Sequence, residues 1–144
     1  MNTVNEQTER PSVLFVCVKN GGKSQMAAGL MTHEVGQAVS VGSAGTRPGK
    51  AINDLSAQTL MDLGIDISAE TPKQLTEQML RDAGLVVVLG TEAQVPPLDQ
   101  VQIEVWETDE PSLRGIEGRE RMELVRDDIH ARVKDLAQRL LGAK

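Results

Sequence analysis

The sequence predicts an α/β protein of three layers, α/β/α, in which helices cover both faces of a four-stranded, mostly parallel sheet. Two apolar runs, Ser12–Cys17 and Leu85–Leu89, have the length and continuity of strands that are buried on both faces. Such runs alternate along the chain with segments of helical periodicity, the pattern that gives parallel strands joined by right-handed crossovers. With 144 residues, the chain is long enough for one domain and too short for two ordinary ones.

The elements of the first half follow one another closely. The first strand, Ser12–Cys17, leads through a glycine-bearing loop into a helix that begins near Ser24. The second strand is expected over Val39–Ser43, and a loop rich in glycine and proline follows it. Asn53 is a suitable N-cap for a short helix that runs to Leu63.

The second half completes the sheet and covers it. A short helix is expected over Thr76–Asp82, and the strand Leu85–Leu89 follows it. The alternation of apolar and polar residues over 101–105 predicts a half-buried fourth strand, at or near an edge of the sheet. Trp106–Gly115 is expected to be a polar loop. Apolar residues every three or four positions predict a long amphipathic helix over about Gly118–Leu141.

The composition excludes several classes of protein. Hydrophobic residues make up 40% of the chain, as in a globular protein. A net charge of −6 argues against a nucleic-acid partner, and an aromatic content of 1% removes base-stacking platforms. We see no secretory signal, membrane-spanning run or lipidation motif, so we expect a cytoplasmic protein with no membrane partner. Residues 1–11 are polar and predict a flexible extension of a single domain, residues 12–144.

The single cysteine, Cys17, restricts the redox chemistry of the chain. No disulfide can form within the chain, so neither a disulfide scaffold nor a relay between two of its own cysteines can operate. With only two histidines, the chain also offers no cysteine- and histidine-rich metal site, and we expect no metal. Any redox step at Cys17 therefore needs a second thiol from another molecule.

The loop after the first strand is the first candidate for a binding site. Its residues are Val18, Lys19, Asn20, Gly21, Gly22 and Lys23. The N–H groups of a loop that enters a helix N-terminus converge, and the helix dipole adds positive potential. Gly21 and Gly22 can adopt a positive φ, and Asn20 tolerates it, so the loop can curl into a nest for a tetrahedral oxyanion. Lys23 adds a charge at the rim, and the same field favours a nucleophilic thiolate at Cys17.

Two other interpretations of this loop are weaker. The residues Gly22, Lys23 and Ser24 fit the end of a nucleotide P-loop, but the first glycine of that motif would fall on Cys17. No magnesium-binding Asp follows the strand that ends at Leu89. Cys17 could also be a small buried hydrophobic residue. The glycines and the lysine directly after it favour an anion site instead.

The Trp106–Gly115 loop is the second candidate. The carboxyl ends of parallel strands meet at one edge of a sheet, so this loop can line one crevice with Cys17, Ser43–Thr46 and the turn after the third strand. Glu110 precedes a proline and is therefore held extended, and its carboxylic acid could donate a proton to an oxygen that leaves the bound anion. Asp109 is the neighbouring alternative. An ordinary solvated acidic loop fits the spacing equally well.

These motifs resemble those of the low-molecular-weight tyrosine phosphatase superfamily. They are Cys17-x5-Lys23-Ser24 on the first strand, Ser43–Thr46, and the acidic residue before proline after the last strand. Within this superfamily, Gly21–Ala28 and Met122–Ile129 resemble the arsenate reductases. The branch that the chain resembles most is the single-cysteine type, the arsenate–mycothiol transferases.

The resemblance implies a fold and a reaction. The fold is a four-stranded parallel sheet flanked by helices. The implied substrate is arsenate, bound by residues 18–23, and the implied catalytic residues are Cys17, Lys23, Ser24 and either Glu110 or Asp109. Cys17 attacks or activates the arsenic. No cofactor is tightly bound: mycothiol is the co-substrate that takes over the arsenic, and a glutaredoxin-like mycoredoxin then releases arsenite.

The chain departs from the usual phosphatase pattern at two residues, Lys23 and Glu110. Lys23 stands where the superfamily usually has arginine, and a lysine cannot grip two oxygens in a planar fork. This replacement argues against an efficient phosphatase. Glu110 stands where the proton donor is usually Asp. A phosphomonoesterase on the same fold and a non-catalytic oxyanion-binding protein are the alternatives.

Overall fold

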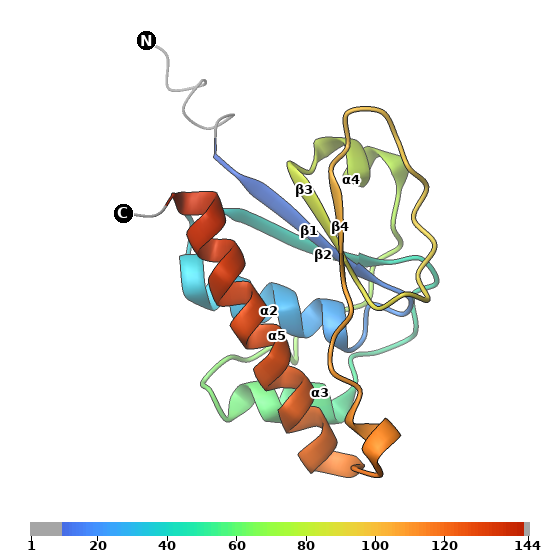
Figure 1. The fold of residues 1–144 in the computed structure, drawn as a ribbon, viewed down its shortest axis with the longest axis vertical. Coiled ribbons are helices and arrows are strands. Elements are labelled where there is room, and N and C mark those ends of the chain that lie inside the picture. The colour runs from blue at the N-terminus through green and yellow to red at the C-terminus, as the bar shows by residue number, and fades with distance from the viewer. Residues whose placement is uncertain (1–9, 143–144) are drawn as a thin grey trace.

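A computed structural model describes residues 10–142 of the chain. Its strands β1 (Ser12–Cys17), β2 (Ser40–Gly45), β3 (Leu85–Leu89) and β4 (Ile103–Trp106) form one sheet in the order β2-β1-β3-β4 (Figure 1). Every pair of neighbouring strands is parallel. The predicted fold class, a four-stranded parallel sheet flanked by helices, is confirmed. Most of the predicted extension, residues 1–11, lies outside the described residues.

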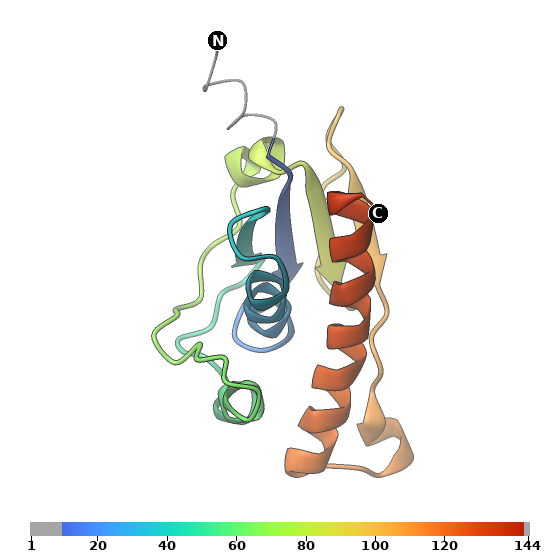
Figure 2. The same cartoon turned by 90° about the vertical axis from the view of Figure 1, so that its left-hand side faces the viewer.

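Helices and loops cover the two faces of the sheet unequally. Helices α2 (Lys23–Val35), α3 (Asp54–Met61) and α5 (Gly118–Leu141) lie on one face and share a hydrophobic core with it (Figure 2). The other face packs against helix α4 (Glu77–Asp82) and the connection over residues 90–102. Because both faces of the sheet are covered, only the two ends of the strands are left open. Parallel sheets bind their ligands beyond the carboxyl ends of the strands.

The second strand lies later in the sequence than expected. It was predicted over Val39–Ser43, but β2 continues to Gly45, which pairs with Cys17 at the end of β1. Glycine lowers the strand propensity of this stretch, and the pairing with a central strand overrides it. Ser43–Gly45 is therefore part of the sheet and not of the loop that follows.

The fourth strand is an edge strand, as predicted, but the burial expected for Val105 belongs to the next residue, Trp106. Val105 is 53% exposed, whereas Trp106, expected to start the polar loop, ends β4 at 4% exposure. The Trp106 ring lies 5.8 Å from that of Phe15, centroid to centroid. The burial of this large aromatic surface decides which side of the strand faces the core. The loop itself contains one 3-10 turn, η1 (Pro111–Arg114).

The helix signals were reliable. The Asn53 side chain accepts a hydrogen bond from the Ser56 N–H at 2.9 Å and caps α3, which ends at Met61 rather than at Leu63. Helix α5 begins and ends where its periodicity predicts. Within residues 10–142, no helix combines the length and the apolar character that crossing a membrane requires.

Candidate active site

Cys17 lies at the point where the strand order of the sheet reverses. It is the last residue of β1; the chain next forms β2 on one side of β1 and later β3 on the other. Such a switch point, at the carboxyl ends of parallel strands, is where open α/β sheets bind their ligands. The Cys17 side chain is half-buried, so the sulfur is both supported and accessible.

The backbone of the oxyanion loop, residues 18–23, is held from its outer side. The carbonyl oxygens of five consecutive residues, from Cys17 to Gly21, each accept a hydrogen bond. The donors are the backbone N–H groups of Thr46, Arg47, Gly49 and Asn53, at 2.7 to 3.1 Å, and the side-chain amide of Gln25 at 3.2 Å.

The position of these carbonyls fixes the direction of the N–H groups. In a trans peptide the N–H points away from the C=O, and the described residues contain no cis peptide bond. The N–H groups of residues 18–22 therefore point to the inner side of the loop. One of them, that of Asn20, donates to Cys17 Sγ at 3.2 Å. The others form a nest of the kind that binds anions.

Asn20 organises the interior of this loop. Its side chain is fully buried, and it has the positive φ, 54°, that the sequence suggested it could tolerate. Its Nδ2 donates to Ser24 Oγ at 2.7 Å, and its Oδ1 accepts from the Lys73 N–H at 2.8 Å and from the Gln25 amide at 3.1 Å. The side chain thus has its partners within the protein and holds Ser24, while only the backbone of Asn20 faces the site.

Ser24 contacts the sulfur of Cys17 and does not cap helix α2. Its Oγ lies 2.9 Å from Cys17 Sγ. Because this oxygen already accepts a hydrogen bond from Asn20, its own hydrogen can point to the sulfur. Helix α2 begins at Lys23 with Gly22 as N-cap, and no side chain caps it, so Ser24 does not act as a cap.

Neither glycine of the loop adopts a positive φ, and only Gly21 lacks room for a side chain. Gly22 has φ −130°, and neither Gly21 nor Gly22 is among the residues of positive φ. A Cβ on Gly21 would lie 2.9 Å from the carbonyl oxygen of Ala51. Of the three residues that could adopt a positive φ in this loop, only Asn20 does so.

The predicted crevice partners have different roles. Ser43–Gly45 lies in β2, and the Thr46 N–H supports the carbonyl of Cys17 from behind the loop. The Gly90 N–H donates to the carbonyl of Trp106 at 2.9 Å, so the turn after β3 is tied to the end of β4. That both segments line the crevice stays a prediction.

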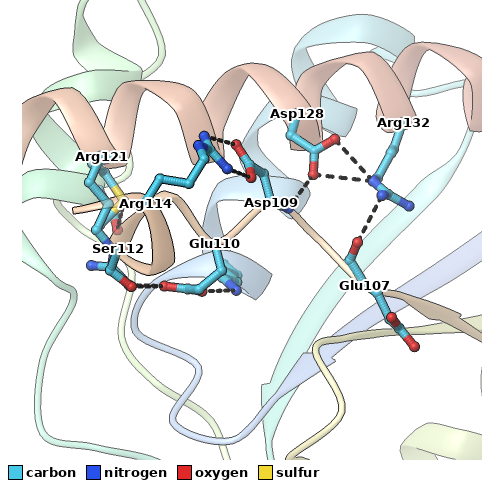
Figure 3. Close-up of polar contacts among 11 residues, drawn as sticks. Glu107, Asp109, Glu110, Ser112, Arg114, Arg121, Asp128 and Arg132 are labelled. Atoms are coloured by element: carbon cyan, nitrogen blue, oxygen red, sulfur yellow. Dashed lines mark hydrogen bonds and ion pairs between the residues drawn. The ribbon is translucent and has the colours of Figure 1, made fainter. Parts of the chain in front are cut away.

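The carboxylate of Glu110 faces the oxyanion loop. Its Oε1 lies 3.4 Å from Lys23 Nζ, and its Oε2 accepts from Arg121 Nη2 at 2.9 Å and from Ser112 Oγ at 3.0 Å (Figure 3). The hydrogen bond from Arg121, with smaller contributions from Ser112 and Lys23, lowers the pKa of Glu110 below its ordinary value, although burial opposes this shift. The structure thus links the acidic loop to the Lys23 end of the oxyanion loop.

Asp109 points to a different partner. Its two carboxylate oxygens accept from Arg114 at 2.8 and 3.2 Å, and this pairing lowers the pKa of Asp109 (Figure 3). Its backbone N–H donates to Asp128 of α5 at 2.8 Å, while Arg132 of α5 donates to the carbonyl of Glu107 at 2.9 Å. Of the two candidate carboxylates, only that of Glu110 contacts Lys23.

Both candidate proton donors are therefore carboxylates near neutral pH, because the pKa of each is lowered from an already acidic ordinary value. The sequence reasoning also missed Arg121, which contacts Glu110 directly. Arg121 lies in the first turn of α5, where the helix dipole disfavours a cation. Its contact with Glu110 joins two different elements, so the sequence around Arg121 does not identify its partner.

Comparison with known proteins identifies the family of this chain. Residues 12–143 match the family model described as low molecular weight phosphotyrosine protein phosphatase. An arsenate reductase of Shouchella clausii is 33% identical over 132 residues, which cover 88% of this chain and 94% of that protein. An arsenate reductase of Bacillus subtilis is 32% identical over 138 residues, 90% of this chain and 97% of that protein.

Solved structures agree. An arsenate reductase in the phosphate binding state superposes with a TM-score of 0.78 at 27% identity, over 90% of this chain and 98% of that one. A thioredoxin-dependent arsenate reductase of Corynebacterium glutamicum gives 0.77 at 31% identity. That match covers 91% of this chain, which spans 62% of the length of the Corynebacterium chain. The chain belongs to the low molecular weight phosphotyrosine protein phosphatase family, in the group that contains these arsenate reductases.

Proposed function

We propose that this protein is a cytoplasmic arsenate reductase of the single-cysteine type, which transfers arsenate to mycothiol. The observation that carries the proposal is the nest of inward N–H groups next to Cys17, in a chain that has no second cysteine. The relatives named as arsenate reductases support the substrate. The thiol is inferred from the lone cysteine and from the resemblance in sequence.

The first step forms a bond between Cys17 and arsenic. Arsenate binds in the nest, and its charge is met by the backbone N–H groups and the Lys23 ammonium. Cys17 Sγ attacks the arsenic, an As–S bond forms, and one oxygen leaves as water, with arsenic remaining As(V). Ser24 and the Asn20 N–H hold the sulfur in position for this attack.

The proton for the departing water can come from Glu110. Lys23 and Arg121 keep this carboxyl ionised in the resting protein. When the Lys23 ammonium pairs with the bound oxyanion instead, Glu110 keeps only Arg121 as a cationic partner. Its pKa then rises, and the carboxylate can take up a proton. Asp109 retains Arg114 throughout and is therefore the weaker candidate.

The next steps need partners from solution. The mycothiol sulfur attacks the arsenic, its As–S bond forms as that to Cys17 breaks, and the thiol proton passes to Cys17. A mycoredoxin thiolate then attacks the mycothiol sulfur of the adduct. The S–S bond of a mixed disulfide forms, the As–S bond breaks, and its electron pair reduces arsenic to arsenite. The two electrons thus come from two thiols outside the chain.

An arsenite-release assay tests the proposal. We expect turnover with mycothiol plus mycoredoxin, and none with thioredoxin alone, because one cysteine cannot form the intramolecular disulfide that thioredoxin would reduce. Robust turnover with thioredoxin alone would contradict the scheme. If the protein binds arsenate but shows no turnover with any thiol, the result would indicate a non-catalytic oxyanion-binding protein.

A phosphomonoesterase is the second candidate, favoured by the match to a phosphotyrosine phosphatase family model. Lys23 argues against it, because a point charge clamps a phosphoryl group less well than an arginine fork does. We expect little hydrolysis of p-nitrophenyl phosphate, and an increase in the Lys23→Arg variant. Efficient hydrolysis by the unmodified protein would favour the phosphatase.

A further inference from the structure

A cavity of about 450 Å³ lies against the outer rim of the oxyanion loop, and no step of the proposed reaction yet uses it. One wall is the loop itself, with Lys19, Gly21, Gly22 and Lys23. The opposite walls come from the segment after β2 and from the first turns of α5; their residues are Gly49, Lys50, Ala51, Asn53, Ser56, Arg121, Met122 and Val125.

The charge of this cavity is opposite to that of the protein. Lys19, Lys23, Lys50 and Arg121 line it, and no carboxylate does, although the chain carries a net charge of −6. Glu110 balances Lys23 and Arg121 from the side of the acidic loop. Lys19 and Lys50 are exposed, and among residues 10–142 neither takes part in an ion pair within 4.0 Å. Two cations thus remain available to a ligand.

The rest of the lining indicates the chemistry of that ligand. Ala51, Met122 and Val125 give the cavity an apolar part. The lysines and the arginine can only donate hydrogen bonds, so they favour a ligand rich in acceptor oxygens. The volume is that of a typical small-molecule site. A small molecule with an apolar stretch and several hydroxyl, amide or carboxylate oxygens meets these conditions.

We infer that this cavity binds the non-reacting part of the low-molecular-weight thiol, and this inference rests on the proposed function. Gly21 and Gly22 belong both to the wall of the cavity and to the nest, so a thiol anchored here is held next to bound arsenate. Lys50 and Arg121 hold its oxygens, and its sulfur extends over the loop to the arsenic. Mycothiol offers hydroxyls and amides, and glutathione offers carboxylates; both have the required acceptors.

Steady-state kinetics test the assignment through Lys50, which lies outside the oxyanion loop. We expect Lys50→Met to raise the KM for the thiol roughly tenfold, by the loss of one charged hydrogen bond. The KM for arsenate should change less than twofold. Lys134→Met, which removes the same charge from an exposed position on α5, is the matched control and should change neither constant. Equal effects of the two variants on the thiol KM would overturn the assignment.

A binding measurement separates this inference from the proposed function. S-methyl mycothiol and S-methyl glutathione, which cannot react, are titrated into the isotope-labelled protein and followed by NMR. We expect shifts in residues 49–53 and 121–125, larger for the preferred thiol, and their loss in Ala51→Leu, which narrows the cavity. Arsenite release without such shifts would overturn the assignment of the cavity as the thiol site but would still support the reductase function. Shifts without arsenite release would support the cavity and contradict the reductase.

Discussion

The two loops that form the site are held in opposite ways. The oxyanion loop, residues 18–23, is fixed mostly by hydrogen bonds to its backbone carbonyls and by the buried side chain of Asn20. The acidic loop, residues 107–114, is fixed largely by charged side chains, with Arg121, Asp128 and Arg132 of α5 as its main anchors (Figure 3). The first arrangement uses uncharged backbone groups and one buried side chain, whereas the second uses charged side chains that are partly buried or exposed.

This difference has consequences for function. Backbone hydrogen bonds join uncharged groups and respond little to salt or pH, so the nest stays formed whether or not a substrate is present. Exposed ion pairs contribute little stability, are screened by salt and depend on protonation. The acidic loop can therefore exchange partners when an anion arrives, and the oxyanion loop provides a fixed frame for it.

The largest expected effect is that of removing the nucleophile from the rigid loop. Cys17→Ser should lower arsenite release at least about 1,000-fold, as the loss of a nucleophile generally does. Arsenate binding should survive, because the nest is made of backbone N–H groups. Turnover and calorimetric binding of the same variant check the two halves of this prediction. Full activity in the variant would remove Cys17 from the mechanism.

The next effect concerns the buried support of the loop. Asn20→Ala leaves the Lys73 N–H and Ser24 without their partner, so we expect a loss of about 2 kcal/mol in unfolding free energy and roughly 100-fold in activity. Gln100 shares the positive φ, 68°, but lies outside the site. Gln100→Ala therefore isolates the effect of placing alanine at a positive φ, without the loss of a buried side-chain partner. Urea unfolding and arsenite release are measured for both, and equal losses of activity would contradict the role of Asn20.

Two adjacent glycines provide a smaller test of the loop's outer contacts. A Cβ at Gly21 would press on the Ala51 carbonyl at 2.9 Å, while one at Gly22 would lie 3.6 Å from Ser56 Oγ, an ordinary contact. Gly21→Ala should therefore reduce kcat/KM for arsenate about tenfold, the effect of a small displacement of positioned groups. Gly22→Ala should retain most of the activity. The reverse order would show that the outer contacts do not position the nest.

The acidic loop should give the smallest effect on stability and the clearest dependence on pH. Because the folded protein lowers the pKa of Glu110 from 4.5, its carboxylate stabilises the fold above that value, and the contribution is lost as pH falls through the lower folded pKa. The side chain is 34% exposed, so we expect about 0.5 kcal/mol.

Urea unfolding of Glu110→Gln at pH 7 and pH 3 checks this sign. The variant should be less stable than the unmodified protein at pH 7, and the difference should shrink at pH 3. The matched control is Glu92→Gln, at an exposed carboxylate for which the described residues provide no ion-pair partner. A difference that grows on acidification would contradict the ionised state of Glu110.

Local signals in the sequence predicted most of the fold. The bounds of β1, β3 and α5 follow from apolar runs and helical periodicity, and Asn53 caps α3 as predicted. Errors arose where long-range contacts decide. The end of β2 depends on pairing with Cys17, and the burial of Trp106 depends on Phe15, so neither could be read from neighbouring residues.

The site divides in the same way. A cysteine followed by glycines and a lysine before a helix predicted where the nest lies, because the geometry is local. Four of the five partners of the loop carbonyls come from residues 46–53, and Arg121 reaches Glu110 from α5, so the sequence could not reveal these contacts. The same limit applies to ionisation: Glu110 and Asp109 look like possible acids in sequence, and their arginine partners, which lower the pKa of each further, are visible only in the fold.

The most direct test of the central claim is a crystal structure of Cys17→Ser soaked in arsenate. We expect one tetrahedral anion inside the oxyanion loop, with N–H groups of residues 18–22 and Lys23 Nζ within about 3 Å of its oxygens. The side chain of residue 17 should lie beneath the arsenic. A loop that stays empty at saturating arsenate, or an anion held elsewhere in the protein, would contradict the account.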